Sequence, residues 1–378
     1  MFLIDISRGE KEVMRYALII AGGAGTRLWP MSTKNLPKQL IPFIDGKSLL
    51  EIAMQRLEGL LPPEQIFICA GLAHREVMLR NLPGMTPERF IGEPMGRDTL
   101  NAIGLGTAVL SRNDPDATVA VFTADHIIEP VDEFQYIVEH GFNIAQSMPD
   151  TLVTFGIAPT HPATGYGYLE LGKPIDGSDA FMLDRFKEKP DMGIAQQYIA
   201  AGPQKYLWNS GMFVWQSKTL LNCIRKYAPD NHTGLMKIVE AWDSEQRRTV
   251  LEQIYPTLKK ISVDFAVMEP ASMDSDMQVA AVPMSIKWID VGSWPSFGLT
   301  RDKDDQGNTV SGCEALFMGC ENTLVVSNND EHLVAGIGCK DMILIHTDKV
   351  TLICRADQAE QIKQLHAMVG QKYGEALL

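Results

Sequence analysis

Short apolar runs alternate with helical patterns through the first 160 residues, and few folds accommodate that alternation. Apolar runs predict strands at 16–21, 65–70, 117–123 and 151–156. Apolar residues at helical spacing predict helices between them, at 48–60, 98–111 and 132–146. Strands separated by helices imply right-handed crossovers and a mostly parallel sheet that is covered on both faces. The fold class is therefore α/β, and ligands of such sheets bind beyond the carboxyl ends of the strands.

The pattern changes after residue 163, where shorter strand-like pieces follow one another. GYGYLEL, FMLDRFKEK and LWNSGMFVW suit a mixed extension of the sheet that forms one wall of a cleft. Helical segments follow at 217–258, and residues 278–290 return as one strand. We therefore predict a Rossmann-like domain with a mixed central sheet at 16–303, preceded by an N-terminal extension at 1–15.

Beyond about residue 303 the strand-like runs become short, and turn residues separate them. They lie at 323–326, 332–335, 342–346 and 350–354, and a helical pattern follows at 356–368. We predict a small β-rich C-terminal domain at 304–378 that ends in a helix, with a left-handed β-helix-like form as one option.

The overall charge limits the partners that the chain can bind. The sequence has 34 Lys and Arg against 47 Asp and Glu, and the resulting charge of −13 opposes nonspecific binding to nucleic acid or to an anionic membrane. A phosphate ligand would then need a local basic pocket and a metal ion. The six cysteines form no CxxC pair, and the N-terminal residues are too polar for a signal peptide. We expect a cytoplasmic protein with reduced thiols and no membrane span.

A glycine-rich turn, GGAGTRLWP at 22–30, directly follows the first predicted strand, and PKQ follows at 37–39. Glycines at a strand end let backbone N–H groups approach phosphate oxygens, and Arg27 and Lys38 add positive charge for a triphosphate. A dinucleotide-binding GxGxxG fits worse because its third glycine is missing, and no GK[ST] follows Gly25 as a Walker A loop requires. A tight turn without a ligand would explain the glycines but not the cations beside them.

The residues GGAGTRLWPMS and PKQ resemble the nucleotide-binding signature of the sugar-1-phosphate nucleotidyltransferases, and the LWP variant resembles that of the mannose-1-phosphate guanylyltransferases. The resemblance continues, in family order, through GEPMGRDT (92–99), TADH (123–126), TGYGY (164–168), FKEKP (186–190), WNSGM (208–212), VDFAVME (263–269) and WIDVGSW (288–294). It covers nearly the whole predicted main domain. It implies transfer of GMP from GTP to α-D-mannose 1-phosphate, which gives GDP-mannose and pyrophosphate.

The resemblance assigns a Mg²⁺ site to Asp125 and Asp290. Asp125 follows one predicted strand and Asp290 ends another, 165 residues later, so the two carboxylates can meet only through the fold. Mg²⁺ prefers oxygen ligands from one or two carboxylates together with substrate phosphates. Either aspartate alone is as readily a helix cap or a turn residue. Together with Arg27 and Lys38, they form the catalytic group that the resemblance implies.

The resemblance also implies two groups of binding residues. Those for the nucleotide are Gly22, Gly23, Gly25, Thr26, Arg27, Glu93, Pro94, Arg97, Asp98 and Thr99. In the sugar-phosphate group, Glu188 and Asn209 would bind hydroxyls, Lys189 would hold the phosphate, and Gly167 would give the ring close backbone access. Without the resemblance, Glu188 and Lys189 in KEKP have the pattern of an ordinary solvated charge run.

His126 is not needed as a general base, because the attacking phosphate is already ionised near neutral pH. We expect it to orient Asp125 or to pack locally. The predicted partners are GTP and mannose 1-phosphate, and the resemblance favours a homodimer assembled with help from the C-terminal domain. Nucleotidyl transfer to another sugar phosphate, and a regulatory homologue without turnover, stay open. Some longer relatives carry an additional isomerase domain that this sequence lacks, so we expect one activity.

Overall fold

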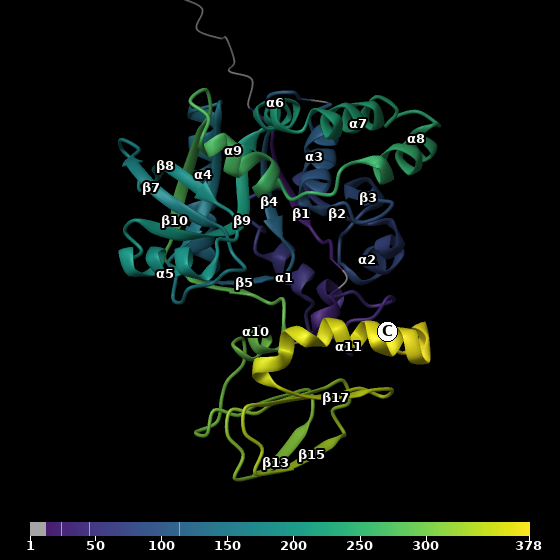
Figure 1. Cartoon of the computed structure of the whole chain (residues 1–378). Coiled ribbons are helices and arrows are strands. Elements are labelled where there is room, and N and C mark those ends of the chain that lie inside the picture. Colours follow the sequence, from purple (N-terminus) through teal and green to yellow (C-terminus); the bar gives the residue numbers. More distant parts are fainter. Residues whose placement is uncertain (1–12, 24, 45, 113) are drawn as a thin grey trace, which may run out of the picture.

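The computed structural model describes residues 13–23, 25–44, 46–112 and 114–378. Most of the N-terminal extension predicted at 1–15 lies outside these residues. A nine-stranded sheet forms the centre of the larger part of the molecule, in the order β3-β2-β1-β4-β9-β6-β10-β8-β7 (Figure 1). The α/β fold class with a mixed central sheet is confirmed.

The first four strands in chain order run parallel, and β9 makes the sheet mixed. The strands are β1 (Arg15–Ile20), β2 (Ile66–Gly71), β3 (Phe90–Glu93), β4 (Thr118–Thr123), β6 (Thr151–Ile157), β7 (Tyr168–Pro174), β8 (Phe181–Lys187), β9 (Tyr206–Gln216) and β10 (Gln278–Met284). β1 pairs in parallel with β2 and β4, and β2 with β3, whereas β9 lies antiparallel between β4 and β6. The carboxyl ends of four parallel strands therefore meet at one edge of the sheet.

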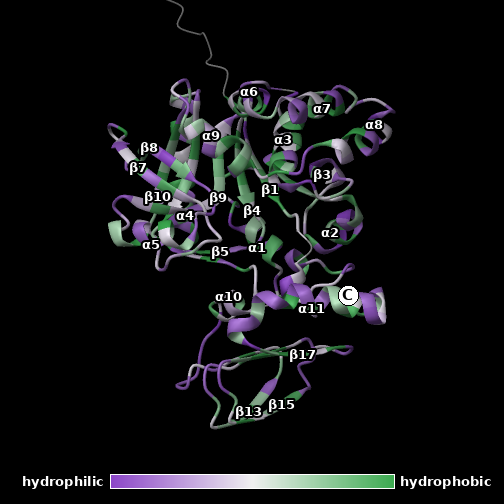
Figure 2. Cartoon of the chain, viewed as in Figure 1, coloured by the Kyte–Doolittle hydropathy of each residue, from purple (hydrophilic) through white to green (hydrophobic). Residues whose placement is uncertain are grey.

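Helices cover both faces of this sheet. They are α1 (Leu49–Gln55), α2 (Arg75–Asn81), α3 (Asp98–Leu110), α4 (Val131–Ser147), α5 (Met192–Ala201), α6 (Ser217–Tyr227), α7 (Pro229–Glu240), α8 (Arg247–Ile254) and α9 (Glu269–Ser272). Alternate residues of β1 face opposite cores: Leu18 packs with α3, α6 and α7, whereas Ala17 and Ile19 pack with α1, α2 and α4. Figure 2 shows the apolar colour concentrated in the strands of the sheet and mixed with polar colour on the covering helices.

The strand predicted at 278–290 is wrong as a single strand. β10 ends at Met284, and a separate strand β11 (Lys287–Asp290) leaves the main sheet to pair antiparallel with β5 (His126–Glu129). β5 lies outside the nine-stranded sheet, and this pairing satisfies the backbone groups of β5 that face β11. Because Asp290 pairs with His126, the two-stranded ribbon brings the end of β11 to the end of β4.

The helix predicted at 48–60 is shorter than expected. Ser48 caps α1, since its side chain accepts a hydrogen bond from the Glu51 N–H at 3.2 Å. The helix ends at Gln55, and the chain then turns through Gly59, whose φ of 86° lies in the left-handed region. A continuous helix through residue 60 is incompatible with that turn.

The C-terminal part is a stack of short parallel strands followed by a helix. Its elements are α10 (Trp294–Gly298), β12 (Thr309–Ser311), β13 (Glu314–Met318), β14 (Leu324–Ser327), β15 (Leu333–Ile337), β16 (Met342–His346), β17 (Thr351–Arg355) and α11 (Ile362–Tyr373). β12, β14 and β16 pair in parallel, and so do β13 and β15, while β17 closes the stack antiparallel to β16. Parallel strands in successive coils are the arrangement of a β-helix.

One buried cluster joins the two parts of the molecule. It contains Leu28, Trp29 and Phe43 from the segment after β1, Phe297 from α10, and Ile345 from β16. The glycine-rich turn is thus packed against the C-terminal part, and Figure 1 shows α11 beside the purple N-terminal segments at the base of the larger part. The domain boundary at 303–304 stays a prediction.

Candidate active site

Two aspartates far apart in the sequence meet beyond the end of β4. Asp125 follows β4, and Asp290 is the last residue of β11. Ligand atoms of Asp125, His126 and Asp290 lie within 4.8 Å of one another, and they form the one group suited to a metal ion among the residues that the structure describes. The fold therefore brings together the two carboxylates that the sequence analysis paired.

Lys38 offsets part of the negative charge of this group. Its ammonium lies 2.5 Å from Oδ2 of Asp125. Burial raises the pKa of Asp125, but the charge and hydrogen bond of Lys38, together with the neighbouring His126 and a backbone hydrogen bond, outweigh it, and the pKa lies below its ordinary value. For Asp290, burial and then the Asp125 charge raise the pKa to about 6, against the opposing charges of Lys38 and Arg27. A divalent cation between the carboxylates would relieve this repulsion.

His126 is held as a neutral side chain beside the aspartates. The indole Nε1 of Trp288 donates to His126 Nδ1 at 3.2 Å, which leaves the proton of the neutral ring on Nε2. Burial lowers the pKa of His126 to about 4. A neutral ring with Nδ1 accepting and Nε2 protonated has no lone pair left for a metal. The expectation that His126 orients or packs, and does not act as a base, agrees with these contacts.

The glycine-rich turn is anchored to Lys38 and its neighbours. Gln39 donates to the Gly22 carbonyl at 2.7 Å, and the Ser32 hydroxyl donates to the Gly25 carbonyl at 2.6 Å. Gly25 has a φ of 62°, and a Cβ there would lie 2.7 Å from the Lys38 Cβ. Only glycine fits this close approach, so the turn and Lys38 are packed as one unit.

Arg27 points from the same turn toward the C-terminal part. It belongs to a short 3₁₀ turn, Thr26–Leu28, which follows Gly25. Its guanidinium Nη1 lies 3.0 Å from Oε1 of Glu360. Gly23 lies on the same turn with a φ of 104°. The structure thus pairs the predicted phosphate-binding arginine with a carboxylate that the sequence analysis did not consider.

Glu93 is a buried carboxylate at the carboxyl end of β3. Its Oε1 accepts a short hydrogen bond from the Tyr255 hydroxyl. Its Oε2 lies 4.0 Å from the position that a Cβ on Gly22 would take, so it borders the glycine-rich turn. Burial raises the pKa of Glu93 to about 7, although the hydrogen bond from Tyr255 opposes the rise. This acceptor beside the turn is suited to a ligand that offers N–H groups.

The predicted nucleotide-binding residues after Glu93 contact different parts of the fold. Pro94 continues the chain from β3, and Arg97 donates a short hydrogen bond to the Pro256 carbonyl. The Thr99 hydroxyl accepts from the Val263 N–H at 2.9 Å and so ties the start of α3 to the segment that precedes α9. Asp98 has a φ of 66° and lies near the sugar-phosphate group, where its charge contributes to the raised pKa values of Glu188 and Lys189.

The four residues predicted for the sugar phosphate lie together between β7, β8 and β9. A Cβ on Gly167 would lie 2.7 Å from Glu188 Oε2 and 3.3 Å from the Asn209 Cβ. Glu188 is buried, and its Oε1 lies 2.9 Å from Nζ of Lys189, which has a φ of 43°. Burial raises the pKa of Glu188, against the hydrogen bond from Lys189. Backbone strain of this kind is frequent at functional sites.

Asp264 is a member of this group that the sequence analysis missed. It accepts from Nδ2 of Asn209 at 2.9 Å, while Thr154 donates to Oδ1 of the same amide at 2.8 Å. These contacts fix the orientation of the Asn209 amide. Burial and then the Glu188 charge raise the pKa of Asp264 to about 7. The motif VDFAVME contained the signal, and Asp264 begins a π-helical turn, Asp264–Met268, a form that often marks functional sites.

Glu269 supports the same group from α9. Its Oε2 accepts from the Glu188 backbone N–H at 3.0 Å, and its Oε1 lies 2.8 Å from Nζ of Lys187. Glu269 therefore fixes the backbone that carries Glu188 and Lys189. No spacing in the sequence relates these positions, because α9 and β8 meet only in the fold.

Comparison with known proteins assigns the family. Residues 16–306 match the Nucleotidyl transferase family, and residues 317–368 match the MannoseP isomerase/GMP-like beta-helix domain. A mannose-1-phosphate guanylyltransferase of Klebsiella pneumoniae is 34% identical over 93% of this chain and 73% of its own length. The chain belongs to the mannose-1-phosphate guanylyltransferases of the nucleotidyl transferase family. Its membership confirms the resemblance that the motifs carried.

Two further proteins are similar to this chain over most of its length. The Xanthan biosynthesis protein XanB of Xanthomonas campestris is 32% identical over 93% of this chain and 72% of its own length. The crystal structure of the mannose-1-phosphate geranyltransferase from Thermus thermophilus matches with a TM-score of 0.83 and 29% identity, over 94% of this chain and 99% of that one. Both parts of the chain are therefore covered by known relatives. Across the described residues, no helix is long and apolar enough to cross a membrane.

Proposed function

We propose that the chain transfers GMP from GTP to α-D-mannose 1-phosphate and releases pyrophosphate, giving GDP-mannose. The observation that carries the proposal is the carboxylate pair Asp125 and Asp290 beside Lys38, at the sheet edge that also carries the glycine-rich turn. The sugar-phosphate group lies at the same end of the sheet, because β9 runs antiparallel to β4 and therefore begins, near Asn209, at the carboxyl end of β4. The guanylyltransferase family supplies the reaction.

Mg²⁺ is the cofactor of this proposal. The donor set fits it, because two carboxylates offer hard oxygen ligands and the neutral His126 ring offers none. When bound by Asp125 and Asp290, the ion would neutralise negative charge on the phosphates. Lys38 already pairs with Asp125 at 2.5 Å and would remain close enough to contact a phosphate oxygen.

The chain's own residues bring two anions together. The backbone of Gly22, Gly23 and Gly25 and the Arg27 guanidinium bind the triphosphate, and Lys189 holds the incoming phosphate. A phosphate oxygen of the sugar phosphate attacks the α-phosphorus in line, and pyrophosphate leaves from the opposite side. No side chain has to remove a proton and no covalent enzyme intermediate forms, so catalysis comes from positioning and from charge neutralisation.

Glu93 is suited to read guanine. The Watson–Crick edge of guanine offers two donors, N1–H and N2–H, which a carboxylate accepts side by side. Adenine offers an acceptor at N1 and would repel the same carboxylate. Since Oε2 of Glu93 borders Gly22, one nucleotide could place its base at Glu93 and its phosphates on the glycine-rich turn. Tyr255 keeps the carboxylate in place through the hydroxyl that it donates.

The test is pyrophosphate release by the purified protein with Mg²⁺, over GTP, ATP, UTP and dTTP against mannose, glucose and heptose 1-phosphates. We expect release with GTP and mannose 1-phosphate only. Release with another pair would keep the chemistry and change the substrates. If no pair of substrates gives pyrophosphate release, although the protein still binds GTP in calorimetry, the result would support a regulatory homologue.

A homodimer in the cytoplasm completes the proposal. The β13–β15 sheet exposes four large apolar side chains, Leu316, Met318, Leu333 and Ile337. A flat apolar sheet face of this kind is a preferred interface between subunits. Sedimentation should give twice the mass of the chain, and Leu316→Lys with Ile337→Lys should give the single mass. A monomeric unaltered protein would remove the dimer from the proposal.

A further inference from the structure

The C-terminal segment returns to the glycine-rich turn and to the residues just after it, and contacts them at three side chains. Glu360 pairs with Arg27 at 3.0 Å, the Leu377 carbonyl accepts from the Trp29 indole N–H at 2.8 Å, and Glu375 pairs with Lys34 at 2.5 Å. Residues 360–377 thus follow the turn along its outer side, where α11 runs beneath the larger part in Figure 1.

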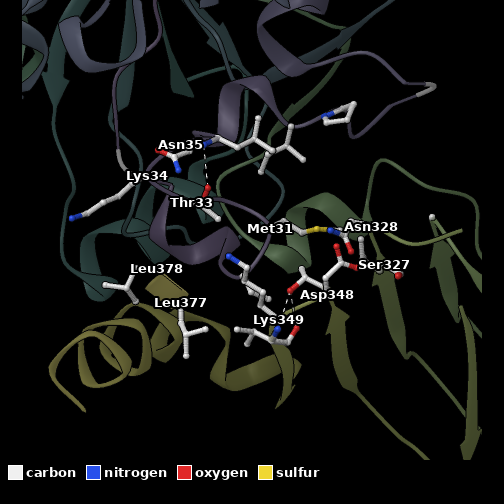
Figure 3. A pocket seen from close by; sticks show the side chains of 18 of the residues that line it. Met31, Thr33, Lys34, Asn35, Ser327, Asn328, Asp348, Lys349, Leu377 and Leu378 are labelled. Carbon is white, nitrogen blue, oxygen red and sulfur yellow. Dashed lines mark hydrogen bonds between the residues drawn. The ribbon is translucent and has the colours of Figure 1, made fainter. Parts of the chain in front are cut away.

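The Trp29 contact is an anchor. Trp29 is only 3% exposed, and its ring also packs edge-on against His366 of α11. Lys34 and the residues from Glu375 to the end of the chain line a cavity of about 1010 Å³ between the turn and the C-terminal part (Figure 3). Because Trp29 is fixed by packing as well as by its hydrogen bond, the C-terminal segment stays attached to the turn.

The Arg27–Glu360 contact differs from the Trp29 contact because both of its side chains are exposed to solvent, as are those of the Lys34–Glu375 pair. The Arg27 side chain is 47% exposed and that of Glu360 is 76% exposed. An exposed ion pair is weak and both side chains can rotate away from it. Arg27 also stands two residues after Gly25, which packs against Lys38, and Lys38 pairs with Asp125 at 2.5 Å. The Arg27 guanidinium is therefore within reach of two alternative acceptors, Glu360 and a phosphate beside Asp290.

We propose that Glu360 is a positioning residue that holds the Arg27 guanidinium at the mouth of the site. The Arg27–Glu360 ion pair breaks when Arg27 binds the triphosphate of GTP, and it forms again as pyrophosphate leaves. The inference rests on the proposed function, since it needs a triphosphate at the glycine-rich turn. It assigns to the C-terminal part a direct electrostatic role in substrate binding and product release.

The strengths of the two interactions indicate that a triphosphate can displace Glu360 from Arg27, so Glu360 does not block the site permanently. A single exposed carboxylate competes weakly, whereas a triphosphate offers several negative oxygens and bidentate geometry to one guanidinium. The competition from Glu360 should weaken triphosphate binding by about two- to fivefold, the range of affinity that one exposed ion pair represents. It should weaken pyrophosphate binding by a similar factor and so help the product to leave.

The test uses the full chain with Glu360→Gln, which keeps the shape and removes the charge. Calorimetry with Mg²⁺ should give GTP and pyrophosphate dissociation constants about two- to fivefold lower than those of the unaltered protein. Glu321→Gln is the matched control, because Glu321 forms a comparable exposed pair with Lys340 at 2.9 Å in the same part of the molecule. It should change neither constant. Equal or weaker binding by Glu360→Gln would overturn the inference.

A double-mutant cycle decides whether the effect passes through Arg27. In an Arg27→Gln background, Glu360→Gln should no longer tighten GTP binding, and thermal unfolding of the four proteins should coincide. The same tightening in that background would overturn the inference, since the carboxylate would then act by general repulsion. Failure of the proposed function would give a different result from failure of this inference. In that case the unaltered protein would release no pyrophosphate, whatever the double-mutant cycle gives.

Discussion

Asp290 is the residue whose removal should separate catalysis from substrate binding. Asp290→Asn keeps the size of the side chain but removes a charge from the proposed Mg²⁺ site, and the loss would act on the charge that develops during phosphoryl transfer. We expect kcat to fall at least about 100-fold while the KM for GTP changes less than about threefold. Steady-state pyrophosphate release measures both, and titration with Mn²⁺ by electron paramagnetic resonance should reveal weaker metal binding.

The exposed Asp302 gives the matched control for this change. Asp302→Asn should leave turnover and Mn²⁺ binding unaltered. Turnover close to that of the unaltered protein in Asp290→Asn would remove Asp290 from the metal site.

Glu93 should make nucleotide affinity depend on pH. Its pKa of about 7 means that the carboxylate is mainly protonated at pH 6 and mainly ionised at pH 8. In the proposed site the guanine N–H donors would bind the ionised form, so we expect affinity to rise with pH, by about tenfold over that interval for a single titration. GDP-mannose is the ligand to use, because its diphosphate diester does not titrate in this range.

Fluorescence titration of GDP-mannose at several pH values measures this dependence. Glu93→Gln should bind more weakly at pH 8 and lose the pH dependence, whereas Glu88→Gln, an exposed carboxylate shortly before β3, should keep it. A pH profile in Glu93→Gln that matches the unaltered protein would assign the titration to another group.

At the residue level, the sequence predicted those residues of the candidate site that lie within contiguous motifs, and their roles stay predictions. Lys38 and Asp125 follow predicted strand ends or the glycine-rich turn, and their meeting needed only the common edge of a parallel sheet. Asp264 and Glu360 were missed for different reasons. Asp264 lay in a quoted motif without an assigned chemistry, and Glu360 lies in a part of the chain whose folding back onto the turn no local pattern encodes.

The start of β7 should be sensitive to a single added methyl group. A Cβ on Gly167 would lie 2.7 Å from Glu188 Oε2, and the buried Glu188 side chain has little room to withdraw. Gly167→Ala should displace this carboxylate from the sugar hydroxyls that we propose it binds, and raise the KM for mannose 1-phosphate about tenfold, with a smaller effect on kcat. Steady-state kinetics with saturating GTP measures the change.

Gly165 offers a close control two residues earlier. An added Cβ there would meet nothing within 4 Å, so Gly165→Ala should leave the KM unchanged. Equal effects of the two substitutions would indicate that loop stiffness, and not the position of Glu188, governs sugar-phosphate binding.

At the level of elements, the sequence predicted the regular crossovers well and the short ribbon poorly. Strands with long apolar runs, such as β1 and β4, follow from local periodicity. β5 and β11 have four residues each, and among the described strands each pairs its backbone only with the other. Since the partner of each lies more than 150 residues away in the sequence, neither local propensity nor spacing could identify the pair that sets Asp290 in place.

For the whole molecule, the shared cluster should make the two parts unfold together. Phe297 of α10 is fully buried, with its ring centroid 4.8 Å from that of Phe43 and 5.7 Å from that of Trp294. Trp294 in turn donates to the Trp29 carbonyl at 3.1 Å, which connects α10 to the glycine-rich turn. Neither part can lose this packing without exposing apolar surface of the other.

Phe297→Ala should therefore destabilise the whole chain by about 3–5 kcal/mol, the usual cost of removing a buried aromatic ring. The space left by the removed ring would lie between the two parts and weaken both. Calorimetry should therefore give one transition at a lower temperature, and limited proteolysis should cut both parts at the same rate. Tyr136→Ala removes an exposed aromatic ring of α4 and should cost less than about 0.5 kcal/mol. Two separate transitions in Phe297→Ala, with the larger part unfolding as in the unaltered protein, would mean that the C-terminal part folds independently and only rests against the turn.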